Sequence, residues 1–548
     1  PYARVEVFAD GVTPHNLASF IAATPRLDLL IDECDSIDMK VLLREEARAN
    51  RVPVIMQTSD RGTLDVERFD LEPERPILHG LAGDIRSRDV AGLTMEQKVE
   101  YVLKIIRPRE ASARLAASML EIGKTIVTWP QLASDVQLGG ALVTVAARRL
   151  CLGQPLGSGR RYLEMDEILS ADHALATPQL QPAIVARSAR TKGTGTPSRS
   201  IAEMLVGYAS LAPSGGNSQP WRFSFRDREL LVALDPNAPV SYRDAGRLGS
   251  YLAIGAAIEN ALIAAAEHGI AVDVKVVREV ANDGVVARLR WGGSAVTRLR
   301  HSERLALIER RATNRRLGDG RPLDEIHAAA LRSAVAGNAV HLQLVSAVDA
   351  RMRVGQILGA FDRIQCSVSA LHAEIAAEMR WTEEEAERTR DGVDIATLEL
   401  GAKEKLALQL VARQDVAAIL RTPGRGRALE TSALQALTSS AAAGLIRVNG
   451  RTHRSFLEAG RAMQRVWLEA TRLGLALQPW TAITFVAKLS GTMQAEIFTP
   501  GEAEEVRKLG EGLDEVFRER SSWTTAILFR VSHAKGPSAC SRRRPVPP

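Results

Sequence analysis

The chain contains few cysteines and few aromatic residues for its length. Its 548 residues include four cysteines, which lie far apart and form no C-x-x-C pair: Cys34, Cys151, Cys366 and Cys540. We therefore expect no structural zinc site, and such sparse cysteine use indicates a reducing, cytoplasmic compartment. Aromatic residues make up only 4% of the chain, so it offers no series of stacking platforms for single-stranded nucleic acid.

Long apolar runs and a strong charge imbalance are missing as well. We find no run of 18 apolar residues and no signal peptide, so we expect neither a membrane-spanning nor a secreted protein. A net charge of +6 is small for this length and does not point to nucleic acid. What is present is the composition of a globular protein with two or three domains. Because the chain begins at Pro1 within a strand-like stretch, we expect earlier residues to be missing.

The first 185 residues alternate strand and helix signals. Tyr2–Ala9, Leu27–Asp32 and Val52–Thr58 have the character of strands, Met39–Asn50 has helix formers throughout, and residues 95–185 are mostly helical in pattern. This order predicts part of an open, Rossmann-like α/β sheet.

A Gly-, Ser- and Lys-rich stretch at 186–200 is typical of a linker. We therefore predict a first domain over 1–185 and a second, α+β domain over 201–548. In the second domain, 201–211 and 248–268 have helical spacing, 221–225 and 230–235 resemble a hairpin, and residues 350–440 are largely helical and charged.

In the first domain, the stretch LLIDECDSIDMK places Asp32, Asp35 and Asp38 just past a strand. Carboxylates at the carboxyl end of a parallel strand lie where open α/β sheets bind ligands, and they can hold Mg²⁺ on a nucleotide. The alternative is a solvated loop in which Asp35 or Ser36 caps the next helix, and the spacing alone favours this alternative.

This stretch and the following VPVI strand and Asp60-Arg61-Gly62 resemble the ThiF/MoeB, ubiquitin-activating E1-like family over roughly the first 90 residues. The resemblance implies that Asp35 is the metal-proximal aspartate of an adenylation site. The family's upstream G-x-G-x-x-G loop and its paired C-x-x-C motifs are absent from this chain. We therefore expect a partial E1-like domain that does not adenylate and uses neither ATP nor Mg²⁺.

The second domain contains the loop APSGGNSQPW, residues 212–221. Its small residues would let the backbone approach a planar ligand, and its hydroxyl and amide groups could bind sugar-like hydroxyls and a ring edge. The alternative is a capped helix end with a tight turn. The loop resembles the APS-x-x-N-x-QPW motif of the FMN-dependent nitroreductase superfamily. This implies FMN contacts from the residues Pro213, Ser214, Gly215, Asn217 and Gln219.

Three further segments resemble the same superfamily. In ERRATNRRL, the residues Arg311, Thr313, Asn314 and Arg315 match its R-x-S-x-R, which binds the FMN phosphate and ribityl chain; the alternative is a basic helix end. In the G-x-x-x-Q helix that contains Gly460 and Gln464, the following loop with Gln478, Pro479 and Trp480 would lie against the flavin ring. The terminal SRRRP, with Arg543 and Arg544, would reach the phosphate, although an arginine cluster is more often a solvated tail.

The order of these segments resembles the actinobacterial, Acg-type branch, in which two halves of one chain form an internal pseudo-dimer. The resemblance implies a helical lid over about 350–430, including His372, Glu374 and Asp391–Asp394, and one FMN per chain. The chain would then be a monomer with an internal pseudo-dimer, or a homodimer.

The implied function is an FMN-dependent NAD(P)H oxidoreductase that reduces nitro compounds or quinones, with no catalytic nucleophile on the protein. Two alternatives remain open. The lid could close the site, giving a flavin-sequestering protein, or the E1-like domain could serve as a docking module for a protein partner.

Overall fold

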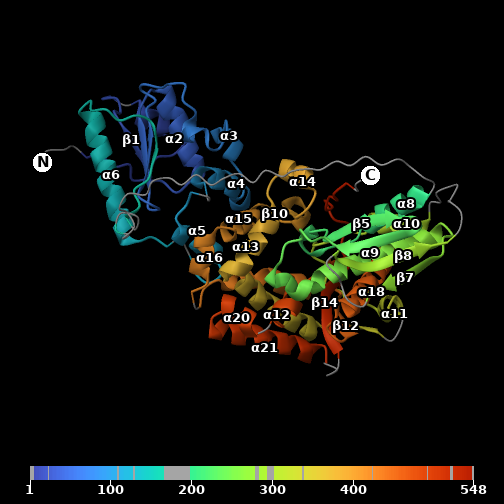
Figure 1. Ribbon diagram of the computed structural model, residues 1–548. Coiled ribbons are helices and arrows are strands. Elements are labelled where there is room, and N and C mark those ends of the chain that lie inside the picture. Colours follow the sequence, from blue (N-terminus) through green and yellow to red (C-terminus); the bar gives the residue numbers. More distant parts are fainter. Residues whose placement is uncertain are drawn as a thin grey trace. The chain divides into compact units, whose positions relative to one another are not determined.

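The computed structural model divides the chain into two compact units (Figure 1). The first unit contains Pro1–Ser188 together with Ala402–Val411, and the second contains Ala189–Gly401 and Ala412–Pro548. The structure describes residues 5–22, 24–107, 110–127, 130–165, 169, 198–277, 283–292, 302–335, 339–422, 424–489, 491–518 and 523–545. The predicted linker lies outside these residues up to position 197, and the helix after it already begins at Ser198.

The first unit is built on a four-stranded sheet in the order β1-β2-β3-β4. Its strands are β1 (Leu30–Asp32), β2 (Val54–Thr58), β3 (Thr63–Glu67) and β4 (Gly159–Arg161). Only β1 and β2 are parallel, whereas β3 is antiparallel to both of its neighbours, so the sheet is mixed. The expected strand at Tyr2–Ala9 does not form over residues 5–9, and its first residues lie outside the described part.

Helices of the first unit surround this sheet. They are α1 (Leu17–Ile21), α2 (Ile37–Ala49), α3 (Ser87–Val90), α4 (Met95–Ile106), α5 (Ala113–Glu121), α6 (Ala133–Cys151) and α15 (Ala402–Val411), with a short 3₁₀ turn η1 (Ile77–Gly80). The hydroxyl of Ser36 caps α2 by accepting from the Met39 amide. Helix α15 comes from far along the chain and packs against α4 and α5. The predicted lid segment therefore contributes one helix to the other unit.

Two four-stranded sheets form the second unit. One has the order β5-β6-β8-β7 and the other β9-β12-β14-β13, and all neighbours are antiparallel. Their strands are β5 (Trp221–Arg226), β6 (Glu229–Leu234), β7 (Val272–Val276), β8 (Val285–Trp291), β9 (Val340–Val345), β12 (Ala442–Asn449), β13 (Ala476–Pro479) and β14 (Trp523–Ser532). In each sheet one long helix joins the second strand to the third. These helices are α9 (Leu248–Glu267) and α18 (His453–Arg472).

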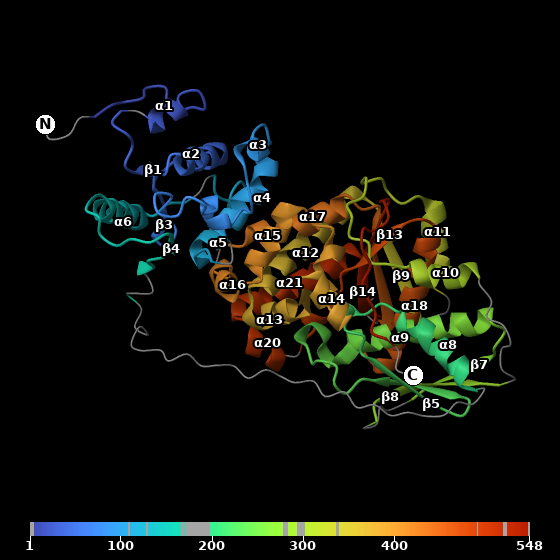
Figure 2. The same ribbon diagram turned by 90° about the horizontal axis from the view of Figure 1, so that it is seen from above.

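Helices α9 and α18 lie side by side in both views (Figures 1 and 2) and form the central contact of the second unit. A Cβ atom built on Gly255 would lie 2.1 Å from the carbonyl oxygen of Leu457, and one built on Gly460 would lie 1.9 Å from that of Leu252. The contact is reciprocal, because each glycine faces the leucine three residues before the other glycine. Two such backbones can approach this closely only where no side chain intervenes.

Burial explains the apolar character of α9. The stretch Tyr242–Glu267 is long and apolar enough to cross a bilayer by length and composition, and 78% of that window is buried inside the protein. The helix packs against α18 and against α8 (Ser198–Ser210), which accounts for apolar residues around its whole circumference.

The chain between β9 and β12 is mostly helical, as expected for the predicted lid. It contains α12 (Val348–Ser367), α13 (Ser369–Glu378), α14 (Glu383–Thr389), α16 (Gln414–Leu420), α17 (Thr431–Thr438) and the short parallel pair β10 (Met379–Arg380) and β11 (Val393–Asp394). The remaining helices of the second unit are α10 (Glu303–Arg310), α11 (Glu325–Ser333), α19 (Ala482–Val486), α20 (Gly491–Ile497) and α21 (Pro500–Val516).

Candidate functional site

The APSGGNSQPW loop joins the end of α8 to β5 and has an unusual backbone. Gly216, Asn217 and Gln219 all have positive φ angles of 56°, 52° and 49°. Left-handed backbone at two residues other than glycine costs free energy and persists only where the surroundings impose it. The Ser214 hydroxyl helps to hold this backbone conformation by accepting a hydrogen bond of 2.9 Å from the backbone N–H of Gln219.

Beside this loop lies a pocket with about 740 Å³ of atom-free space, including its mouth. It is lined by Leu211, Pro213, Ser214, Gly216, Asn217, Ile308, Glu309, Arg311, Ala312, Thr313, Arg315, Gly392, Val393, Cys540, Ser541 and Arg543. Four segments that are far apart in the sequence therefore meet here: the loop, the R-x-T-x-R stretch, the lid and the C-terminal tail.

Three arginines give the pocket its chemistry. Arg311 is 6% exposed, stacks 4.7 Å from the centroid of the Trp467 ring and donates to the Leu211 carbonyl. Arg315 donates to the carbonyl and hydroxyl of Thr397, and Arg543 donates to the Asn217 amide oxygen. The Nε atoms of Arg311 and Arg543 are buried without a hydrogen-bond partner. Buried donors of this kind normally have partners, which a water or a ligand in the pocket would supply for these two atoms.

The electrostatics of the pocket favour an anion. Within the described part of the chain, none of these three arginines lies within 4.0 Å of a carboxylate oxygen. Burial, together with the charge of Arg543, lowers the pKa of Arg311 to about 9, and burial lowers the pKa of Arg315 and of Arg543 to about 10. All three guanidiniums remain charged at neutral pH. The one carboxylate in the lining, Glu309, is exposed, so the positive charges dominate.

The side-chain amides of Asn217 and Gln219 form hydrogen bonds with the C-terminal tail and with the predicted lid. The Asn217 amide donates to the Arg542 carbonyl, and its oxygen accepts from Arg543. The Gln219 amide donates to the Arg390 carbonyl in the lid at 2.8 Å, and its oxygen accepts from the Arg544 amide at 2.9 Å. These side chains, expected at the flavin, therefore tie the loop to the tail and to the lid.

Ion pairs join the tail to the lid directly. Arg542 pairs with Glu383, Glu387 and Asp394 at 3.3, 2.6 and 2.9 Å, and Arg544 pairs with Asp391. Between these acidic residues, Gly392 and Val393 line the pocket. Gly392 and Val393 thus form one wall of the pocket, and ion pairs join the residues around them to the tail.

Several residues expected at the flavin lie outside this pocket. Asn314 donates to the Lys535 carbonyl, Gln478 accepts from Arg530, and Pro479 lies on β13 opposite Phe529. Gly215 and Arg544 are beside the pocket but not in its lining, and Trp480 packs against a separate hydrophobic core. The structure therefore places Arg311, Arg315 and Arg543 in the pocket lining, and Asn314, Arg544, Gln478, Pro479 and Trp480 outside it.

The sequence reasoning missed a carboxyl next to Trp480. Asp362 of α12 accepts hydrogen bonds from Gln365, at 2.6 Å, and from the Trp480 indole. Burial raises the pKa of Asp362 to about 7, and these hydrogen bonds only partly oppose it. A signal was present, since this aspartate follows the buried Phe361 within an apolar stretch of the helix.

We predict that Asp362→Asn makes the second unit more stable than the wild type, and that this difference in the free energy of unfolding grows as the pH rises from 4 to 7. The folded wild type holds a proton on Asp362 that the unfolded chain has already released, so the stability supplied by the neutral carboxyl is complete below pH 4 and is lost as the pH rises through 7. The asparagine stays neutral, and the gain should reach at most about 4 kcal/mol near pH 7. Urea unfolding at several pH values measures it. Asp415→Asn is the control, because the Arg413 hydrogen bond lowers the pKa of that exposed carboxyl and no such gain should follow.

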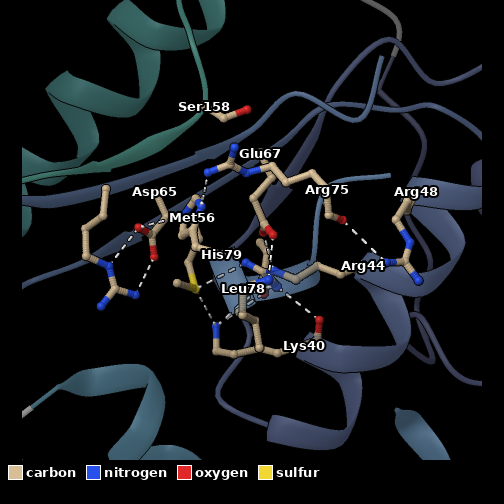
Figure 3. Close-up of polar contacts among 12 residues, drawn as sticks. Lys40, Arg44, Arg48, Met56, Asp65, Glu67, Arg75, Leu78, His79 and Ser158 are labelled. Atoms are coloured by element: carbon tan, nitrogen blue, oxygen red, sulfur yellow. Dashed lines mark hydrogen bonds and ion pairs between the residues drawn. The ribbon is translucent and has the colours of Figure 1, made fainter. Parts of the chain in front are cut away.

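The acidic stretch of the first unit has a structural role at Asp32. Arg44 is fully buried and donates to Asp32 at 2.5 Å and to Glu67 at 2.6 Å; Glu67 in turn accepts from the Leu78 amide, as Figure 3 shows for Arg44, Glu67 and Leu78. Burial alone would raise the pKa of Asp32, but the charges of Arg44 and Lys40 hold it below its usual value. This network fixes α2, β3 and the left-handed turn at Leu78 and His79.

Asp35, expected beside a metal, is exposed and separate from that network. Among the described residues there is no group of three or more His, Cys, Asp or Glu side chains that could hold a metal ion. The expectation that this unit does not bind ATP or Mg²⁺ stays a prediction.

Comparisons with known proteins show which sequences and solved structures this chain resembles. No family model matches it. Two solved structures of nitroreductases with bound FMN resemble it, one from Bacteroides fragilis NCTC 9343 (11% identity, 45% of this chain, 95% of that chain, TM-score 0.24) and one from Desulfitobacterium hafniense DCB-2 (13%, 45%, 95%, 0.24). A protein of Mycobacterium tuberculosis (strain CDC 1551 / Oshkosh), "Uncharacterized protein MT1398", is 36% identical over 544 residues, which span 99% of this chain and 74% of that protein. The chain therefore belongs to the same family as MT1398.

Proposed function

We propose that the second unit binds FMN and acts as a nitroreductase-like oxidoreductase that takes electrons from NAD(P)H and reduces nitro compounds or quinones. One observation carries this proposal. The three segments that resemble the FMN-binding motifs of that superfamily, around Ser214, Arg311 and Arg543, line a single pocket.

The pocket suits the phosphate of FMN. A phosphate monoester has several acceptor oxygens and a double negative charge, and it would supply the partners that the Nε atoms of Arg311 and Arg543 lack. Arg315 adds a third positive charge, and the hydroxyls of Ser214 and Thr313 suit the ribityl chain. FMN, when bound, supplies the hydride chemistry, while these residues bind and orient it.

We infer that the two sheets are the halves of an internal pseudo-dimer with one FMN per chain, as in the Acg-type branch. Their identical strand order and the reciprocal contacts of Gly255 and Gly460 support this, since a two-fold axis makes each contact appear twice. The resulting molecule would act as a monomer or as a homodimer.

The contacts of the lid favour a second candidate function, flavin sequestration. The ion pairs of Arg542 and Arg544 hold the lid over the pocket, and the Glu378 carboxylate lies against Gly216, where an added Cβ would be 2.7 Å from it. A lid held in this way would retain a ligand while excluding a nicotinamide donor and an electron acceptor.

A flavin assay separates the two functions. The full chain is reconstituted with FMN and NADPH or NADH is added without oxygen. If the protein is a reductase, the bound FMN should bleach and then reoxidise when a nitroaromatic or quinone is added. If it sequesters flavin, the bound FMN should resist both nicotinamides. Absence of bound FMN after reconstitution would exclude both functions.

The double variant Arg542→Gln with Arg544→Gln sharpens this assay. It removes the tail–lid ion pairs and leaves Arg311, Arg315 and Arg543 in place. If the lid limits access, FMN should dissociate about tenfold faster or more from the variant, with a smaller effect at high salt, because salt already weakens exposed pairs in the wild type. Equal dissociation rates would show that the lid does not restrain the ligand.

A further inference from the structure

Cys540 is the one cysteine of the four that lines the anion pocket. Its thiol is exposed, and it precedes the tail segment that carries Arg543. Burial raises the pKa of the Cys34 and Cys366 thiols to about 12, so neither forms a thiolate at neutral pH. Cys151, which is also exposed, lies on α6 of the first unit. The two exposed thiols therefore differ in their surroundings: Cys540 lines the arginine pocket, whereas Cys151 follows Arg148 and Arg149 in the last turn of α6.

We propose that Cys540 is a modification site for small anionic disulfides, such as glutathione disulfide, and that the adduct competes with phosphate for the arginine pocket. The proposal needs only the anion-binding pocket and stands whether or not the ligand of that pocket is FMN.

The unpartnered arginines supply recognition of the reagent. The Nε atoms of Arg311 and Arg543 lack hydrogen-bond partners, Arg311 is 6% exposed, and both residues line the same pocket as Cys540. Carboxylates of a disulfide reagent would therefore be attracted to the place where the thiol lies, which raises the local concentration of reagent.

The reaction balances without a further oxidant. The Cys540 thiolate attacks one sulfur of the disulfide, the S–S bond of the reagent breaks, a mixed disulfide forms at Cys540, and the second half leaves as a thiolate. The reagent is reduced and Cys540 is oxidised. The carboxylates of the bound half can then pair with Arg311 and Arg543, which leaves no room for a phosphate on the same guanidiniums.

The test compares two probes of different charge on the full chain. The anionic probe is 5,5′-dithiobis(2-nitrobenzoate) and the neutral probe is 4,4′-dithiodipyridine. The Cys151→Ser variant leaves Cys540 as the exposed thiol, so its reaction rate is that of Cys540. The Cys540→Ser variant leaves Cys151 as the exposed thiol and serves as the control. We expect the anionic-to-neutral rate ratio to be about tenfold higher at Cys540 than at Cys151. Equal ratios at the two thiols would overturn the proposal and leave a merely accessible cysteine.

Two further measurements address the pocket itself. Inorganic phosphate should slow the anionic probe at Cys540 more than chloride of equal ionic strength does, and it should leave Cys151 unaffected. Arg311→Met in the Cys151→Ser background should lower the anionic rate and preserve the neutral one. An equal effect of phosphate and chloride, or an unchanged anionic rate in Arg311→Met, would refute recognition by the arginines. Glutathione disulfide should then add one glutathionyl group at Cys540 by mass spectrometry.

Discussion

Gly460→Ala should lower the free energy of unfolding of the second unit by at least about 2 kcal/mol. A Cβ at this position would lie 1.9 Å from the Leu252 carbonyl oxygen, and a backbone atom cannot move aside as the end of a side chain can. Helices α9 and α18 would have to separate, which opens gaps along the most extensive contact of the unit and loses dispersion energy over its length. Gly255→Ala should act similarly, because its Cβ would lie 2.1 Å from the Leu457 carbonyl oxygen.

The measurement is urea unfolding of the full chain, followed by tryptophan fluorescence, to which Trp467, a buried residue of α18, contributes. Gly207→Ala is the matched control, since this glycine is also within a helix but has no atom within 4 Å of an added Cβ. That variant should be more stable than the wild type by about 0.5–1 kcal/mol, because alanine is the better helix former. Opposite signs for two Gly→Ala changes would identify the close crossing as the cause. A Gly460→Ala protein as stable as the wild type would disprove it.

Arg311→Met should weaken FMN binding by about 10- to 100-fold while leaving the ligand-free protein as stable as the wild type or more so. A hydrogen bond to a charged group contributes about 1.5–3 kcal/mol, which the variant loses at the phosphate. In the free protein, Arg311 is a buried charge with an unpartnered Nε, and an apolar side chain of similar length removes that desolvation penalty and can still pack on Trp467. Arg543→Met should behave in the same way: it loses one hydrogen bond, to Asn217, just as Arg311→Met loses the one to the Leu211 carbonyl.

Riboflavin, which lacks the phosphate, provides the internal comparison. Its affinity should change little in Arg311→Met, so the preference for FMN over riboflavin should fall by the same 10- to 100-fold. Arg332→Met is the matched control, because Arg332 is exposed and pairs with Glu325 at 2.6 Å, away from the pocket. An unchanged FMN-to-riboflavin preference in the Arg311 variant would mean that the pocket does not hold the phosphate.

Individual helices and strands could be predicted from the sequence where the spacing of apolar residues fitted one kind of secondary structure. The apolar spacing of 248–268 predicted α9, the alternation around the Arg226–Glu229 turn predicted the β5–β6 hairpin, and Ser36 was one of two expected caps of α2. The prediction failed at Tyr2–Ala9, where residues 5–9 alternate like a strand but pair with no other strand. Alternation describes a side-chain pattern, whereas a strand also needs a hydrogen-bonding neighbour. The antiparallel strand β3 was missed although it forms a hairpin with the preceding strand β2; only its second partner, β4, lies far along the chain.

By itself the sequence determined which residue types could make an anion pocket, because the motifs around Ser214, Arg311 and Arg543 are each contiguous. Only the tertiary structure decided that these three segments meet, that the amides of Asn217 and Gln219 bind the tail and the lid, and that α15 belongs to the first unit. It alone decided which arginines keep an unpartnered nitrogen. The physical reason is that a short motif sets local backbone preference, whereas burial and the completion of hydrogen bonds depend on which distant segments come into contact.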